Sequence, residues 1–182
     1  MLENLTNLVK QQAGDAIINN PAIPNQKNDE AVQAASGSIV DTLKNALAGG
    51  QIKDVMSLFA NGQATAEQPV VQQATGNFME KLQSQFGLNG SQASGIAKDL
   101  IPNVMNQFAQ KTADPADNSF DAQQIFNQLS GGKTSGLNIQ SMLNKLKGGL
   151  DSDGDGDVDL QDLKAMFSGG GSVVDKLKGF LG

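Results

Sequence analysis

The 182-residue chain contains no cysteine, no histidine and no arginine, so that all thirteen of its basic residues are lysine. Without cysteine and histidine there are no disulfides, no thiol or imidazole metal ligands and no histidine general base, which argues against zinc and iron–sulfur centres. Without arginine the chain lacks the bidentate clamp that commonly holds phosphate. An acidic chain of this kind, with no basic patch rich in aromatics, also predicts no nucleic-acid binding.

Aromatic residues are scarce as well: there are eight phenylalanines and no tyrosine or tryptophan. The core must therefore be built mainly from aliphatic side chains, methionine and those phenylalanines. Alanine, glutamine, lysine and leucine are plentiful and β-branched runs are short, which favours an all-α fold. No stretch approaches the roughly 18 consecutive apolar residues of a membrane span, and the N-terminal residues do not resemble a signal peptide. We expect a cytoplasmic protein without a transmembrane segment.

Apolar residues recur at helical spacing through most of the chain, which predicts a bundle of short amphipathic helices. Asn28 or Asp29 is expected to cap the second helix, and Ser91 a later one that Pro102 should kink or restart. The first four helices are expected over residues 2–18, 28–47, 52–59 and 70–86.

One short stretch, DSDGDGDVDLQDL at residues 151–163, holds six of the nineteen acidic residues. The other thirteen acids are balanced by the thirteen lysines, so the whole net charge of −6 belongs to this stretch. Charge this local predicts either a cation site or a solvated acidic linker.

The twelve residues 151–162 follow the pattern of a calcium loop. Acids stand at the first, third, fifth, seventh, ninth and twelfth positions, Gly156 stands at the sixth, where a sharp turn needs positive φ, and Val158 is the apolar eighth residue. Because a hard divalent cation prefers oxygen ligands, we predict one bound Ca²⁺, with Mg²⁺ as an alternative occupant. The predicted ligands are Asp151, Asp153, Asp155, Asp157 through its backbone carbonyl, Asp159 directly or through water, and Asp162.

This loop resembles those of EF-hand calcium-binding proteins, with one departure. The twelfth residue is Asp162 rather than glutamate, as in dockerin repeats, the calcium-binding modules that dock onto scaffold proteins outside bacterial cells. Only one well-formed loop is present and NIQSMLNKLKGGL supplies a full entering helix, so EF-hand-like is the better description. The shorter aspartate requires a tighter loop, which would weaken calcium binding or improve the fit of magnesium.

An internal repeat with an offset of 38 residues accompanies this motif. It aligns FDAQQIFNQLSGG (120–132) with VDLQDLKAMFSGG (158–170), and IPNVMNQF (101–108) with IQSMLNKL (139–146). The stretch AGGQIKDVMSLFANG (48–62) is a weaker third version of the exit helix of this unit. The repeat predicts two helix–loop–helix units that bury each other's apolar faces, although short amphipathic helices with glycine ends can also resemble one another by chance.

The repeat identifies residues 113–124 as a degenerate sister loop. It keeps Asp117 and Asp121 at the fifth and ninth positions but lacks acids at the first, third and twelfth. We therefore predict that it binds no ion and that its Phe120 packs beside Val158.

These patterns suggest four parts of the chain. They are an N-terminal helical unit (1–62), a linker with central helices (63–100), an EF-hand-like pair (101–170) and a C-terminal amphipathic helix (171–182).

A second resemblance covers residues 77–132. FGLNGSQASGIAKDLIPNVMNQF, followed by LSGG, resembles the small uncharacterised bacterial domains of the YidB-like family. This resemblance implies a helical bundle and a bacterial origin, and it assigns no activity.

Three functions stay open. The first is a calcium-binding protein in which the ion has a structural or protein-interaction role. The second is a calcium sensor that exposes a methionine-containing groove to an unidentified protein partner. The third, an enzyme with paired carboxylates, is disfavoured because the other acids are scattered singly and no tryptophan or tyrosine can stack on sugars. We expect no enzymatic activity. The methionines in question are Met56, Met79, Met105, Met142 and Met166, for which ordinary core positions are the alternative.

Overall fold

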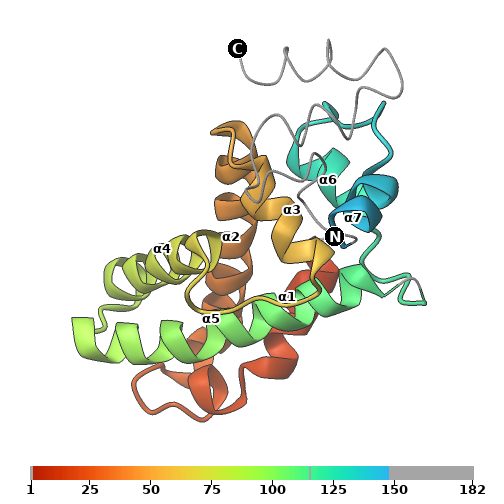
Figure 1. The fold of residues 1–182 in the computed structure, drawn as a ribbon. Coiled ribbons are helices and arrows are strands. Elements are labelled where there is room, and N and C mark those ends of the chain that lie inside the picture. The colour runs from red at the N-terminus through yellow and green to blue at the C-terminus, as the bar shows by residue number, and fades with distance from the viewer. Residues whose placement is uncertain (1, 115, 148–182) are drawn as a thin grey trace.

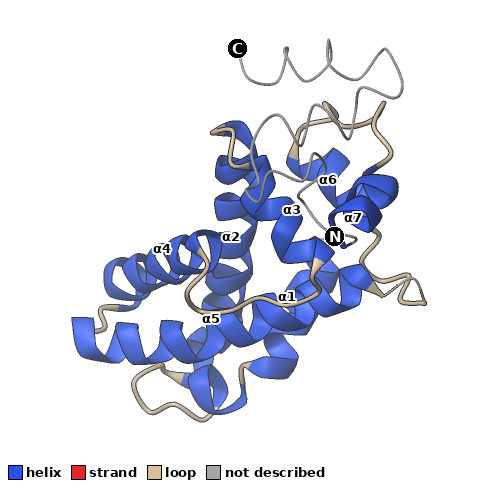
Figure 2. Ribbon diagram, viewed as in Figure 1, coloured by secondary structure: helices blue, strands red, loops and turns tan. Residues whose placement is uncertain are grey.

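The computed structural model describes residues 2–114 and 116–147, and this part of the chain is an all-α bundle (Figure 1). The predicted fold class is thus confirmed: Figure 2 shows helices joined by loops, with no strand among the described residues. The predicted calcium loop and the C-terminal amphipathic helix lie outside the described residues. The α-helices are α1 (Leu2–Gln12), α2 (Asn28–Ala48), α3 (Ile52–Ala60), α4 (Pro69–Phe86), α5 (Gly90–Ala113), α6 (Ala122–Leu129) and α7 (Ile139–Lys147).

Helices α1, α2, α4 and α5 form the larger part of the bundle, and α4 and α5 lie side by side after a short turn (Figure 1). The buried face of α2 consists mostly of small residues, which allow neighbouring helices to approach closely. Among them Thr42 is buried with its hydroxyl, which accepts a 2.8 Å hydrogen bond from the Asn77 side chain of α4 and donates to the Ser38 carbonyl. Two long helices are therefore joined by a partly buried hydrogen bond as well as by apolar packing.

The first predicted helix is wrong in its extent, because α1 ends at Gln12 rather than at Ile18. The next residues form a π-helical turn, Gly14–Ile18, in which the Ile18 amide donates to the Ala13 carbonyl at 3.0 Å. Glycine is a poor residue for continuing an α-helix. The wider turn also buries Ile17 completely, so that tertiary packing compensates for the break.

Two predicted helix caps are also wrong. Helix α5 is capped by Asn89 rather than Ser91: the Asn89 side chain accepts from the Gln92 amide at 2.9 Å, and the Gln92 side chain accepts from the Asn89 amide at 3.2 Å. This reciprocal capping box satisfies two helix-end donors. At the start of α2 the cap position is Lys27, which makes no side-chain cap, so neither Asn28 nor Asp29 serves.

Helix α5 continues through Pro102 and does not restart there. Proline has no N–H, so the helical hydrogen bond to the Lys98 carbonyl is missing. The Asn103 side chain donates to the neighbouring Asp99 carbonyl at 2.7 Å. The buried residues on either side of the proline, Ile101 and Val104, hold the helix against the core at this point.

Phenylalanine rings attach the shorter helices α3 and α6 to the bundle. The Phe59 ring of α3 lies between two others in edge-to-face contacts, with centroid distances of 5.2 Å to Phe108 of α5 and 5.6 Å to Phe126 of α6. Phe120 also packs edge-to-face against Phe108, with a centroid distance of 5.0 Å. Such pairs contribute about 0.5–1.5 kcal/mol each beyond the area they bury. A continuous row of four rings therefore joins α3, α5 and α6.

Candidate functional site

The predicted metal ligands Asp151, Asp153, Asp155, Asp157, Asp159 and Asp162 all lie outside the described residues. The structure does describe helix α7, the predicted entering helix. Asn138 caps α7 by accepting from the Ser141 amide at 2.8 Å. One face of the helix is buried, and α7 packs against α3 and α6. The buried residues on this face are Ile139, Met142, Leu143 and Leu146.

Gln123 of α6 fixes the start of α7. Its side-chain oxygen accepts from the Ile139 amide at 2.9 Å, and its side-chain nitrogen donates to the Thr134 carbonyl at 3.3 Å. Thr134 is itself buried and shares a 3.2 Å hydrogen bond with Ser130. One glutamine thus connects two helices and the loop between them, so the N-terminal end of α7 is held in place.

Helices α5 and α7, which the 38-residue offset aligns, bury residues at the same aligned positions. Ile101 and Phe108 of α5 are buried, as are their counterparts Ile139 and Leu146 of α7. The two intervening pairs, Val104 with Met142 and Met105 with Leu143, are also buried. The second half of the alignment falls on residues 158–170, outside the described part, so the repeat stays a prediction.

The predicted sister loop connects α5 to α6. Asp117 accepts from Lys111 Nζ at 3.0 Å and from the Ser119 amide at 2.8 Å. The hydrogen bond from Lys111, followed by those from Ser119, lowers the pKa of Asp117 below its ordinary value. Asp121 caps α6 by accepting from the Gln124 amide at 2.7 Å.

The acids of this loop thus stabilise turns, cap helix α6 and form an ion pair. The Asp114 side chain stabilises another turn by accepting a hydrogen bond from the Ala116 amide at 2.9 Å. Within residues 2–114 and 116–147 no three acidic side chains come together in a group that could hold a metal ion. Phe120 is buried against Phe108, and its predicted partner Val158 lies outside the described residues.

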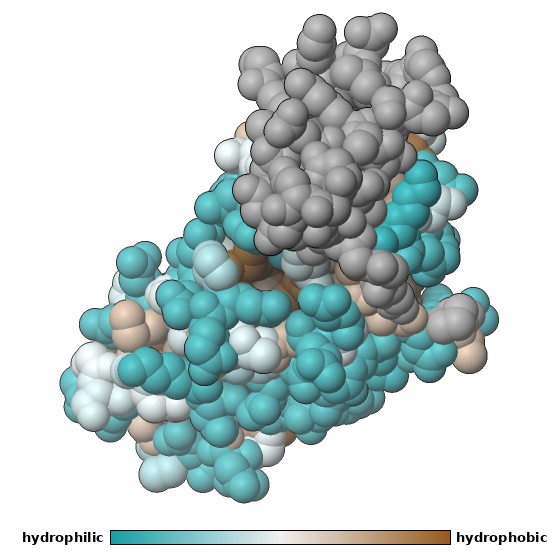
Figure 3. All heavy atoms as spheres, in the orientation of Figure 1, coloured by the Kyte–Doolittle hydropathy of each residue, from teal (hydrophilic) through white to brown (hydrophobic). Residues whose placement is uncertain are grey.

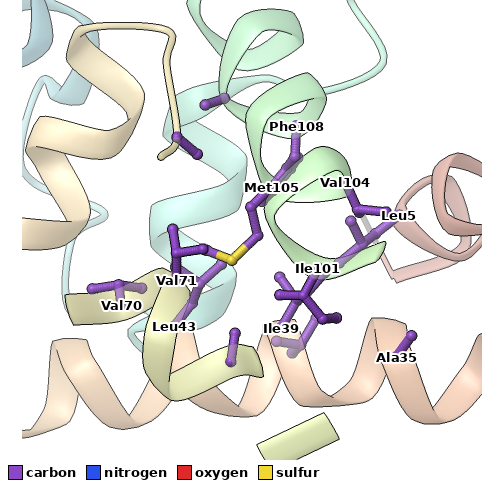
Figure 4. Packing of buried hydrophobic residues seen from close by; sticks show 14 of the residues in the cluster. Leu5, Ala35, Ile39, Leu43, Val70, Val71, Ile101, Val104, Met105 and Phe108 are labelled. Carbon is purple, nitrogen blue, oxygen red and sulfur yellow. The ribbon is translucent and has the colours of Figure 1, made fainter. Parts of the chain in front are cut away.

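Three of the five methionines considered for a sensor groove lie in the core. Met56, Met105 and Met142 are buried, and Figure 4 shows the Met105 side chain pointing toward Leu43 of α2 and Val71 of α4. Met79 is only partly buried, and Met166 is outside the described part. A groove exposing these three side chains would require the core to open.

Sequence reasoning missed a hollow between α4 and α5. It has a volume of about 420 Å³, and its lining is mostly apolar. Two signals were available in the sequence: Gly76, which leaves space in the middle of α4, and Pro102 in α5. The lining residues are Ala66, Gln72, Thr75, Gly76, Met79, Lys98 and Pro102.

A second, more open hollow carries two carboxylates, Asp15 and Asp99, between the π-helical turn and α5. Both side chains are exposed, and Asp15 accepts a hydrogen bond from Asn19.

On the face seen in Figure 3, hydrophilic residues predominate outside the grey residues, and apolar ones show only in small areas. None of the described helices combines the length and the apolar character needed to cross a bilayer.

Comparison with protein-family models, with curated proteins and with solved structures finds no match to this chain.

Proposed function

We propose that this chain is a calcium-binding helical protein in which residues 151–162 bind one divalent cation in a structural or protein-interaction role. The observation that carries the proposal is the loop pattern itself: six aspartates at ligand positions, a glycine at the turn, and the entire net charge of the chain in one place. Oxygen-rich loops of this kind suit calcium.

The packing of α7 supports the proposal. An EF-hand-like loop needs an entering helix whose direction is fixed, because that helix positions the first ligand. Helix α7 is described as far as Lys147, four residues before Asp151, and its start is held by Asn138 and Gln123. A packed helix therefore precedes the predicted loop by a few residues.

The ion would stabilise the folded chain. Six aspartates in twelve residues repel one another, and a divalent cation both neutralises and orders them. A ligand that binds only the folded state adds about 2.7 kcal/mol of stability at a concentration one hundred times its Kd. Calcium should therefore raise the melting temperature, and magnesium should do so if Asp162 tightens the loop around a smaller ion.

We also propose that the two helix–loop–helix units descend from one repeat and that loop 113–124 no longer binds an ion. The matching buried positions of α5 and α7 support this relationship. The Asp117 carboxylate is hydrogen-bonded to Lys111 and Ser119, contacts that a metal ligand would have to give up.

A structural role ranks ahead of the sensor because Met56, Met105 and Met142 are core residues. A sensor would expose apolar surface when it binds calcium, and an environment-sensitive dye would detect that change. The structural role predicts a higher melting temperature with unchanged dye fluorescence.

Isothermal titration of chelator-stripped protein with Ca²⁺, repeated with Mg²⁺, tests the proposal. We expect one calcium per chain. Asp151→Ala, which removes the first ligand, should abolish binding, whereas Asp117→Ala, which removes an acid from the sister loop, should leave it intact. Two ions per chain would show that the sister loop also binds. If neither ion gives heat or a shift in melting temperature, residues 151–162 are an acidic linker.

A further inference from the structure

We propose that the hollow between α4 and α5 is a binding site for a small amphipathic anion, an apolar molecule that carries one carboxylate or sulfonate group. The site is distinct from the predicted calcium loop and does not depend on it. Its volume of about 420 Å³ lies within the range of small-molecule pockets.

The floor of the hollow suits an apolar body. Met79 and Gly76 come from α4, one helical turn apart, and Pro102 faces them from α5. A Cβ built on Gly76 would meet no atom within 4 Å, so the glycine leaves open space above the helix. The flexible Met79 side chain, only partly buried, can adapt to ligands of different shape.

The charge at the rim suits an anion. Lys98 lines the hollow from α5, one turn before Pro102, and makes no ion pair with any residue that the structure describes. The lining contains no acidic side chain. The remaining polar groups, the Gln72 amide and the Thr75 hydroxyl, are neutral. An apolar floor beside one unpaired cation is complementary to an apolar molecule with one negative charge.

Titration with 1-anilinonaphthalene-8-sulfonate tests this site, because the dye has an apolar ring system and one sulfonate and becomes fluorescent in apolar surroundings. The full chain is used with chelator present, so that the result is independent of calcium binding. We expect saturable enhancement at one site, with octanoate displacing the dye more effectively than octan-1-ol does.

Matched variants locate the site. Gly76→Leu should fill the hollow and abolish the enhancement, whereas Gly95→Leu, the same change at another helical glycine with open space, should not. Lys98→Gln should weaken dye binding about two- to fivefold, the range for an exposed ion contact, and Lys44→Gln should leave it unchanged. Circular dichroism and melting temperature confirm that each variant is folded.

Three results would overturn the proposal. They are the absence of saturable enhancement in the unaltered protein, enhancement that persists in folded Gly76→Leu, and dye binding that is the same in Lys98→Gln as in Lys44→Gln. The lysine variants change exposed side chains only, so they keep the test decisive even if Gly76→Leu does not fold.

Discussion

Helices α2, α4 and α5 run for 21, 18 and 24 residues, whereas α3, α6 and α7 have only nine, eight and nine. The long helices pack through small side chains as well as large apolar ones, and a partly buried hydrogen bond joins α2 to α4. Phenylalanine rings join the short helix α3 to α5 and α6. Isolated helices shorter than about 12–15 residues are marginal in water. The short-helix region therefore depends on its packing against the long helices, above all through Phe59, and it is this region that leads to the predicted calcium loop.

The largest expected effect comes from removing Phe59. Phe59→Ala should lower the free energy of unfolding by about 3–5 kcal/mol, because a fully buried ring between two others is lost. Urea unfolding followed by circular dichroism measures the loss. Phe78→Ala in α4, where the ring is equally buried, is the matched control and should cost a similar amount.

Hydrogen exchange separates the two variants. Phe59→Ala should reduce amide protection in α3, α6 and α7 more than in α4 and α5, since the short helices lose their attachment. An equal loss of protection in all helices would show that the short-helix and long-helix regions unfold as one unit.

A smaller effect is expected within the long-helix region. Thr42→Val keeps the side chain's shape but removes the hydrogen-bond partner of the partly buried Asn77 amide, which should cost about 0.5–1.5 kcal/mol. A double-mutant cycle with Asn77→Ala measures the coupling. If the two losses simply add, the Thr42–Asn77 contact does not join α2 to α4.

The smallest effect concerns the loop between the two regions. The lowered pKa of Asp117 means that its ionised form favours the folded state, so its contribution is present above the ordinary aspartate pKa and is lost as pH falls through the lowered value. Asp117→Asn should therefore be slightly less stable than the unaltered protein near neutral pH, and the difference should vanish in strong acid. A difference independent of pH would exclude the Lys111 ion pair as its cause.

The sequence predicted the helices better than their ends. Periodicity located the helices up to α5 because burial of one face dominates their energetics. The Asn89–Gln92 capping box was visible as an asparagine followed three residues later by glutamine, but Ser91 competed for the same role. Gly14 was a sequence signal for the break after Gln12, but the π-helical turn that follows is stabilised by burial of Ile17 in the assembled core, which helical periodicity does not show.

The calcium loop and the hollow between α4 and α5 also differ in how far the sequence predicts them. The calcium loop is local, so its ligands can be predicted from spacing along the chain. Gln123 contacts Thr134, 11 residues further along the chain, and Ile139, 16 residues further along, and no periodicity predicts these contacts. The hollow requires Gly76 and Lys98 to face one another across two helices, which only the packing of α4 on α5 determines.

A calcium titration followed by backbone amide NMR of the full chain shows directly which residues bind the cation. We predict that the amide shifts saturate at one equivalent and are concentrated in residues 151–162 and the adjoining end of α7, while α2, α4 and loop 113–124 stay unchanged. Shifts centred on loop 113–124, or a spectrum unaffected by calcium, would contradict the proposal that residues 151–162 are the cation site.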